Sequence, residues 1–249
     1  MMVMNWIEWQ PIYEDIVRRL NLDPKKDIQA TQLLTELLIE VDPEPILHQL
    51  ENQIKDRMVV ICGAGPSLET HVKMLKERSD YQDLVFVAAD GAVSLLLEQN
   101  CPCDLIVTDL DGDLNHIKQA TQNGAILIVH GHGDNMDKIQ EIVPNLGLVL
   151  GSTQVEPTER VFLWGGFTDG DRACYVVTTY APKGIILAGM DFGKIVGKWS
   201  KPSHESHFQA PRRKLVKLEI AYDLITTLFD RTDIPYTILE SVPRTDVGE

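Results

Sequence analysis

Two aspartates separated by one residue, Asp109 and Asp111, are the strongest candidates for chemistry in this chain. They follow residues 104–107, an apolar run with the pattern of a short buried strand. Because side chains alternate along a strand, we expect both carboxylates to point the same way and Leu110 to point the opposite way. Such a pair is stable when a cation lies between the charges, and oxygen ligands suit Mg²⁺. We therefore predict that Asp109 and Asp111 bind Mg²⁺.

Other aspartates also follow apolar, strand-like runs, namely Asp90, Asp134 and Asp191. Ligands of open α/β sheets gather at the carboxyl ends of the strands, so these side chains are expected at one rim. We predict Asp134 as a third metal ligand and Asp90, with the following Gly91, as a nucleotide contact. The alternative role of both Asp90 and Asp134 is to cap a helix.

The segment around His130 and His132 offers a second type of metal site. His-x-His followed by Asp134 could bind zinc in principle. No further His or Cys lies at a supporting spacing, so we favour oxygen ligation here and assign His132 to substrate binding.

A glycine-containing turn follows the apolar run at residues 58–62. Glycines allow a tight turn and the close approach of a ligand, and the start of the next helix favours an anion. The nucleotide fingerprint is incomplete because Leu68 occupies the third glycine position. We predict that the turn contacts a nucleotide through Gly63, Ala64, Gly65, Pro66 and Ser67.

A third polar segment begins at Gly165 and combines glycines with hydroxyl, carboxylate and guanidinium groups. These groups at a helix start suit a hydroxyl-rich or heterocyclic ligand. We assign Thr168 and Asp171, together with Asp191, to substrate binding. Arg172 is a candidate catalytic residue, although it could equally form a structural ion pair with Asp169 or Asp171.

The charge reverses between residues 194 and 217, where seven basic residues accompany one acidic residue, Glu205. Arg and Lys bind phosphates, so this basic loop is predicted to be a mobile clamp on phosphate groups. The alternative is compensation of the acidic surface. The candidate phosphate-binding residues are Lys194, Lys198, Arg212, Arg213 and Lys214.

These residues must be positioned by a large α/β fold. Residues 1–57 contain apolar residues at helical spacing and are predicted to be a helical N-terminal segment. Residues 58–249 are predicted to be the catalytic domain, with a C-terminal amphipathic helix, a last strand at 235–239 and a loose tail. We predict a three-layer, mostly parallel, Rossmann-like sheet. Its other strands are expected near 58–62, 84–88, 104–108, 125–129, 147–150, 161–164 and 185–189.

Composition excludes several classes of protein. The net charge of -14 argues against a nucleic-acid binder, which would need a basic face. No stretch approaches the roughly 20 apolar residues of a membrane span, and the first residues do not resemble a signal peptide. Four cysteines without zinc spacing indicate neither a disulfide scaffold nor a zinc cluster. We expect a cytoplasmic protein that binds neither nucleic acid nor membrane.

The motifs together resemble the archaeal 6-hydroxymethyl-7,8-dihydropterin pyrophosphokinases of tetrahydromethanopterin biosynthesis. The resemblance runs from about Met58 to the C-terminus. It is carried by the segments 63–69, 90–92, 108–113, 130–135, 165–172 and 188–193. The segments 90–92 and 109–111 are also similar, more distantly, to motifs of thiamin pyrophosphokinases, and related glycosyltransferase-like proteins share the sequence of residues 63–68.

The resemblance implies a reaction in which ATP and the pterin alcohol give AMP and the pterin diphosphate, with Mg²⁺ as cofactor. Such chemistry needs alignment and charge neutralisation more than a covalent nucleophile. Catalytic roles then fall to Asp109, Asp111, Arg172 and Lys194, while His132 and Asp137 are candidate general bases. A homodimer is a candidate assembly. The alternatives are another nucleotide-dependent transferase or a non-catalytic nucleotide-binding regulator.

Overall fold

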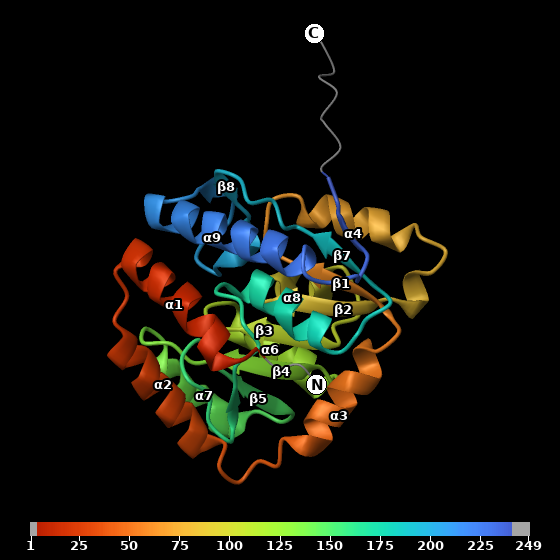
Figure 1. Cartoon of the computed structure of the whole chain (residues 1–249). Helices are drawn as coiled ribbons and strands as arrows, with labels where there is room; N and C mark the ends of the chain where they lie inside the picture. The colour runs from red at the N-terminus through yellow and green to blue at the C-terminus, as the bar shows by residue number, and fades with distance from the viewer. Residues whose placement is uncertain (1–3, 241–249) are drawn as a thin grey trace.

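The computed structural model describes residues 4–240, which form an eight-stranded sheet in the order β10-β7-β1-β2-β3-β4-β5-β6 (Figure 1). All seven neighbouring pairs of strands are parallel. Each predicted strand is present to within two residues at either end. The strands are β1 (Met58–Cys62), β2 (Val85–Ala89), β3 (Leu105–Thr108), β4 (Ile126–His130), β5 (Val149–Ser152), β6 (Val161–Phe162), β7 (Gly184–Ala188) and β10 (Tyr236–Ile238).

Helices cover both faces of the sheet, which confirms the predicted three-layer α/β fold. One face packs against α1 (Trp6–Leu20), α3 (Glu44–Ile54), α8 (Asp169–Thr179) and α9 (Arg212–Phe229). The other packs against α4 (Leu68–Lys76), α5 (Ala92–Glu98), α6 (Leu114–Gln122) and α7 (Met136–Ile142). The central strands are apolar throughout because both of their faces are buried: Val59 and Ile61 belong to the first core, and Val60 and Cys62 to the second.

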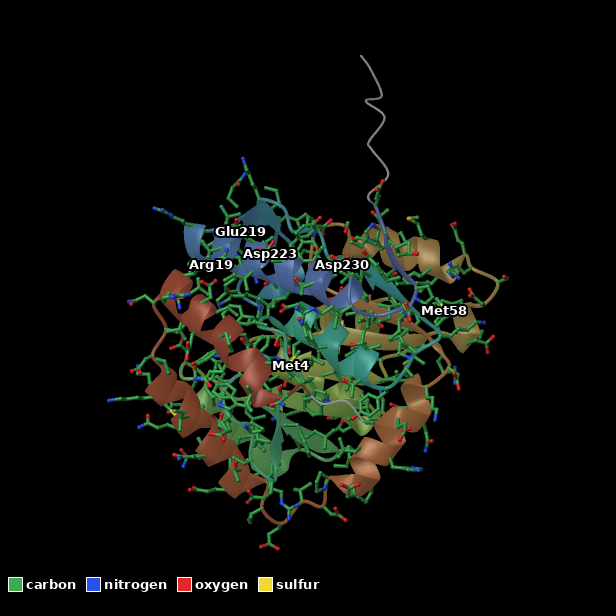
Figure 2. The ribbon with its side chains drawn as sticks, in the orientation of Figure 1. Met4, Arg19, Met58, Glu219, Asp223 and Asp230 are labelled. Atoms are coloured by element: carbon green, nitrogen blue, oxygen red, sulfur yellow. The ribbon has the colours of Figure 1, made fainter. Side chains whose placement is uncertain are left out.

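The predicted helical N-terminal segment consists of α1, α2 (Pro24–Leu37) and α3. It shares a core with the sheet, since Trp9 and Leu50 are fully buried in the cluster that contains Val59. Arg19 of α1 also lies 3.0 Å from Glu219 and 3.9 Å from Asp223 of α9 (Figure 2). Helices α1 and α9 are therefore packed together over one face of the sheet.

The basic segment contains secondary structure where the sequence suggested a loop. An antiparallel ribbon pairs β8 (Ile195–Val196) with β9 (Phe208–Gln209), with a 3₁₀ turn at Lys198–Ser200. Further 3₁₀ turns lie at Tyr81–Asp83 and Val143–Asn145. The tail that was expected to be loose lies outside the described residues. Within residues 4–240, no helix has the length and apolarity required to cross a membrane.

The strand order creates one topological switch point. From β1 the chain adds β2 to β6 on one side, and it then returns through α8 to place β7 on the other side of β1. The loops after β1 and β7 diverge at this point, which is where ligands of doubly wound sheets bind. Because α8 runs back across the sheet, its N-terminus is delivered to the rim formed by the carboxyl ends of the strands.

Candidate active site

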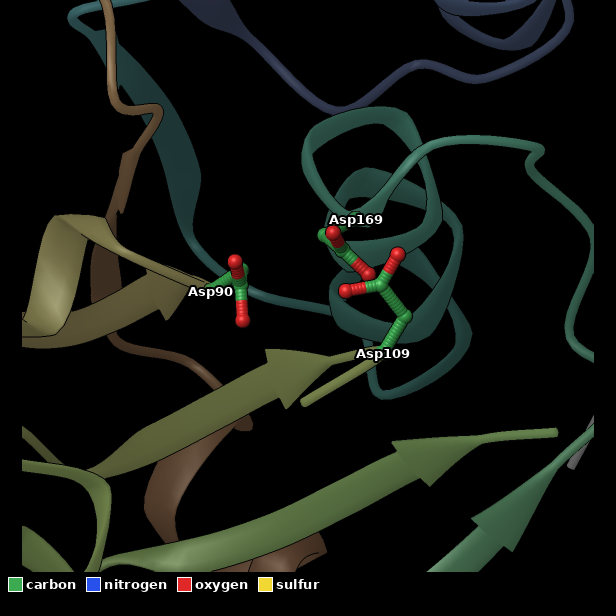
Figure 3. Close-up of side chains that lie close together, drawn as sticks. All are labelled: Asp90, Asp109 and Asp169. Carbon is green, nitrogen blue, oxygen red and sulfur yellow. The ribbon is translucent and has the colours of Figure 1, made fainter. Parts of the chain in front are cut away.

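A cavity of about 690 Å³ lies over the carboxyl ends of the strands. Its wall includes Asp90 after β2, Asp109 after β3 and Asp169 at the start of α8. One carboxylate oxygen from each of these residues lies within 4.8 Å of the others, and Figure 3 shows the three side chains converging from separate elements. Three hard oxygen donors in one place form a group that can hold a divalent cation.

Asp111 lies outside this cluster, and the local backbone explains why. Strand β3 ends at Thr108, and Leu110 adopts a left-handed conformation with φ of 67°. The alternation expected from a continuing strand is therefore interrupted. Leu110 is buried as expected, but the Asp111 carboxylate accepts a hydrogen bond of 2.6 Å from Lys138 Nζ and lies 3.5 Å from Lys201 Nζ. The structure thus groups Asp109 with Asp90 and Asp169, and places Asp111 in a neighbouring ion pair on the cavity wall.

Asp134, the predicted third ligand, is exposed and lines the cavity without joining the carboxylate cluster. Its backbone N–H donates to Nδ1 of His132 at 3.2 Å. The proton of His132 therefore resides on Nε2, which faces Asp109 Oδ2 at 3.5 Å. In this state His132 presents its Nε2–H to Asp109, and Asp137 is exposed on α7, away from the cavity wall. These positions do not favour either His132 or Asp137 as the general base.

Burial and neighbouring charges shift the pKa values of the three carboxylates. Burial, followed by the charge of Asp109, raises the pKa of Asp90 to about 7, even though Thr108 and the N–H of Gly112 donate hydrogen bonds to it. Burial and the same neighbouring charges raise the pKa of Asp169 well above its ordinary value. For Asp109 burial acts in the same direction, but His132, the N–H of Asp111 and the charge of Lys217 together lower the pKa. A cation among these groups would relieve their repulsion.

Positive charge faces the carboxylates from two other elements. Lys214 and Lys217 project from the first turns of α9, and Lys201 follows the ribbon strand β8. Burial, followed by the proximity of Lys217, lowers the pKa of Lys214. Acidic and basic walls on one cavity suit a polyphosphate bound together with a cation.

The predicted basic contacts divide into two groups. Arg213 and Lys214 line the cavity, and Arg213 also donates to the carbonyl of Leu20 at 2.8 Å. Lys194, Lys198 and Arg212 lie outside the cavity wall. Lys198 instead stacks on Trp199, with Nζ 4.4 Å from the ring centroid. The basic residues of segment 194–217 that line the cavity therefore lie mainly on α9.

The predicted nucleotide turn lies at the switch point, and Gly63, Ala64 and Gly65 line the cavity while Pro66 and Ser67 lie behind it. Several of its N–H groups already have partners. Gly63 donates to Ala188 O at 2.8 Å and Gly65 to Gly189 O at 2.9 Å. The N–H of Ser67 donates to the Asp191 carboxylate at 3.1 Å, so a side chain of the protein itself occupies the expected anion position. Asp191 also lines the cavity. The turn therefore forms part of the cavity wall, and its N–H groups are not arranged to bind a phosphate.

Gly91 also lines the cavity, and its surroundings leave no space for a side chain. A Cβ atom at this position would lie 1.8 Å from the carbonyl oxygen of Trp199. The 3₁₀ turn at Lys198–Ser200 therefore packs on the loop after β2 only because residue 91 is glycine. This contact holds the basic segment across the cavity.

The segment at the start of α8 has both exposed and buried members. Thr168 lines the cavity, whereas Asp171 and Arg172 are fully buried behind it. Asp171 accepts hydrogen bonds from the N–H groups of Phe167 at 2.5 Å and Thr168 at 2.8 Å, which completes a capping box. Burial raises the pKa of Asp171 despite these bonds.

Arg172 connects several loops beneath the site. Its guanidinium donates to the carbonyls of Thr153, Gly165 and Phe167 at 3.3–3.4 Å and to His130 Nε2 at 3.1 Å. Arg172 is therefore placed to fix the loops, and its side chain does not reach the cavity. His130 is buried between Arg172 and the carbonyl of Ser152. Burial, followed by the charge of Arg172, lowers the pKa of His130 well below its ordinary value.

Sequence reasoning missed several residues of the cavity wall. Asp169 was considered as one of the polar groups of its segment and as a partner of Arg172, but not as a metal ligand, although its place one residue after the N-cap Thr168 puts it at a helix start. Lys217 follows Lys214 by one helical turn, which is a usable signal for a shared face. Asp27 of α2 and Gln154 after β5 also line the cavity, and no motif marked either of them.

Comparisons with known proteins identify a family for this chain. Residues 34–197 match the family model described as "6-hydroxymethylpterin diphosphokinase MptE-like". The chain is 43% identical over 225 residues to the 6-hydroxymethyl-7,8-dihydropterin pyrophosphokinase of Pyrococcus furiosus, which covers 90% of this chain and 94% of that protein. It is 38% identical over 241 residues to the protein of the same name from Methanocaldococcus jannaschii, with 94% and 99% coverage.

A third relative of that name, from Methanothermobacter thermautotrophicus, is 34% identical over 235 residues, with 94% of this chain and 98% of the relative covered. These matches span nearly the full length of each relative. The resemblance noted in the sequence is confirmed, as is the predicted class of enzyme, a pyrophosphokinase. The chain belongs to the family of MptE-like 6-hydroxymethylpterin diphosphokinases.

Proposed function

We propose that this protein transfers the terminal diphosphate of ATP to 6-hydroxymethyl-7,8-dihydropterin, giving AMP and the pterin diphosphate. The family and the names of the relatives support the pterin and the type of transfer. The observation that carries the proposal is the cavity itself, in which Asp90, Asp109 and Asp169 converge opposite Lys214 and Lys217. A cavity with carboxylates on one side and lysines on the other is suited to a triphosphate bound with a cation.

The three carboxylates fit Mg²⁺, because they supply oxygen donors only and because burial, followed by neighbouring carboxylate charge, raises the pKa of Asp90 and Asp169. In the proposal Asp90, Asp109 and Asp169 hold the ion. When bound, it would neutralise charge on the phosphate oxygens and help to orient them. His132 would keep Asp109 oriented through its Nε2–H.

The reaction breaks the bond between the β-phosphorus and the oxygen that bridges it to the α-phosphate. The pterin hydroxyl oxygen forms the new bond to the β-phosphorus, AMP departs with the electron pair, and the hydroxyl proton is released. Lys214 and Lys217 would stabilise the charge that develops on the transferred group. Thr168 and the residues after β1 and β7 would position the substrates, and little covalent chemistry is required of the protein.

The product carries a diphosphate on a carbon next to the pterin ring, where it is a good leaving group. We therefore place the reaction in the biosynthesis of a tetrahydromethanopterin- or folate-type cofactor, in which an amine displaces this diphosphate. The type of product supports this placement.

The decisive experiment incubates the purified protein with ATP, Mg²⁺ and the reduced pterin and measures AMP and pterin diphosphate. We expect equal amounts of the two products, and no AMP when the pterin is omitted. Release of ADP or inorganic phosphate without pterin would indicate a kinase or an ATPase instead. ATP binding without turnover under all conditions would indicate a regulator.

A further inference from the structure

The cavity extends beyond the carboxylate cluster to a polar end formed by α2 and by the loops after β4 and β5. The wall at this end contains Asp27, His132, Gly133 and Gln154. Asp27 is 5% exposed and Gln154 is 3% exposed, yet both contribute to the cavity wall. A buried carboxylate at the end of a substrate cavity is costly unless hydrogen-bond donors satisfy it.

Among residues 4–240, three neutral groups donate hydrogen bonds to the Asp27 side chain. Oδ2 accepts from the hydroxyl of Tyr13 at 2.6 Å and from Nε2 of Gln154 at 2.8 Å. Oδ1 accepts from the N–H of Gly133 at 2.8 Å. A carboxylate can accept about four hydrogen bonds, so this arrangement orients the group and leaves Oδ1 able to accept one more.

The sequence around β4 is adapted to bring α2 to this position. A Cβ atom on Gly133 would lie 2.5 Å from Lys26 Cβ, and one on Gly131 would lie 3.2 Å from the carbonyl oxygen of Ala30. Glycine at both positions therefore allows α2 to pack directly on the loop that also carries His132. The spacing that resembled a zinc motif serves instead to place Asp27 at the cavity wall.

The opposite end of the cavity has a different character. There Phe192, Val196, Phe208 and Leu218 supply apolar surface beneath the ribbon and beside α9. That surface suits the flat faces of an adenine base. The polar α2 end suits a heterocycle that presents several donors and acceptors on one edge, which is the character of a 2-amino-4-oxopyrimidine ring.

We propose that Asp27 is the residue that selects the pterin, by accepting a hydrogen bond from its 2-amino group at the α2 end of the cavity. This inference rests on the proposed function, because it assigns one of the two substrates to one end of the site. The 6-hydroxymethyl group would then extend toward the carboxylate cluster, and the adenine would lie under the ribbon.

The test compares the pterin with an analogue in which oxygen replaces the 2-amino group. For the wild-type protein we expect kcat/KM to be about 100-fold lower with the analogue, because its oxygen would face the Asp27 carboxylate without a proton between them. In Asp27→Asn, kcat/KM for the pterin should fall about 10- to 100-fold, and discrimination between the two substrates should shrink to a few-fold. The KM for ATP should stay within about threefold of the wild-type value.

Tyr13→Phe is the matched control, since it removes one donor to Asp27 and leaves the carboxylate in place. We expect this variant to keep the wild-type discrimination between pterin and analogue. If Asp27 only clamps the helices, Asp27→Asn and Tyr13→Phe will lower activity with both substrates in equal proportion, which would overturn the inference. Binding of the pterin alone, followed by its fluorescence, provides the same comparison without turnover.

The outcomes separate the two proposals. Wild-type protein that forms pterin diphosphate, together with Asp27→Asn that retains full discrimination, would overturn this inference and leave the proposed function standing. A raised KM for ATP with unchanged discrimination would place the adenine at the α2 end and also overturn it. Wild-type protein that forms no pterin diphosphate would overturn the proposed function and this inference together.

Discussion

The raised pKa of Asp90 predicts a specific dependence of stability on pH. In the folded protein this pKa is about 7, because of burial and the charge of Asp109, compared with an ordinary value of 3.8. The folded state therefore binds the Asp90 proton more tightly than the unfolded chain does. In the absence of divalent cations, the free energy of unfolding should decrease as the pH rises from about 4 to about 7.

The size of the effect follows from the difference between the two pKa values. A difference of about 3 corresponds to about 4 kcal/mol, since each pKa unit is worth about 1.4 kcal/mol. In a chain of this length that loss lowers Tm by roughly 10 °C. Asp90→Asn removes the charge and keeps an oxygen that can accept from Thr108 and Gly112, so most of the decrease should disappear. The raised pKa of Asp169 adds a decrease in the same direction.

The assay is thermal unfolding in EDTA between pH 4 and pH 8, for the wild-type protein, for Asp90→Asn and for Asp134→Asn. Asp134 is an exposed carboxylate on the same cavity, so its variant should follow the wild-type curve. Adding millimolar Mg²⁺ at pH 8 should raise the Tm of the wild-type protein more than that of Asp90→Asn. Parallel pH curves for wild type and Asp90→Asn in EDTA would refute the argument that Asp90 carries an uncompensated charge.

Three further substitutions test the placement of individual residues. Asp169→Asn should lower kcat at least about 100-fold without lowering Tm, whereas Asp134→Asn should change kcat only a few-fold. The reverse order would favour the metal set predicted from sequence. Lys214→Gln should lower kcat/KM for ATP about 100-fold, as measured by AMP formation. Arg172→Met should lower Tm by about 10 °C, because buried carbonyls lose their donor, while the folded enzyme keeps kcat within a few-fold; a large loss of kcat at full stability would support a catalytic role.

The fold could be predicted from the sequence because a parallel sheet covered on both faces leaves a simple pattern. Each central strand is a short, continuous apolar run, and each is followed by glycine or polar residues at the rim. That pattern located all eight strands of the main sheet. The ribbon was missed because β8 and β9 contain two residues each, which is too short for alternation to be detected.

The candidate site was predictable only in part, for two physical reasons. The pairing of Asp109 with Asp111 assumed that β3 continued, but the positive φ of Leu110 ends the alternation, and no sequence signal marks a leucine for that conformation. Asp169 comes from a helix that crosses the sheet after the edge strand β6. Its position is therefore set by strand order, which the pattern of apolar runs does not encode.

Asp90 shows how sheet register could have replaced sequence proximity as a guide to the cluster. In the pairing of β2 with β3, Ala89 lies opposite Val107, so Asp90 and Thr108 are the next residues along the two strands. The Thr108 hydroxyl indeed donates to Asp90, and Asp109 follows immediately. Strands consecutive in sequence are commonly adjacent in parallel sheets, so aligning the ends of β2 and β3 brings Asp90 beside Asp109 without any knowledge of the rest of the fold.

The same alignment cannot supply Asp169, whose approach depends on packing of α8 across the sheet. The carboxylates from strand ends are therefore accessible to sequence reasoning, and the one that completes the cluster requires the three-dimensional structure.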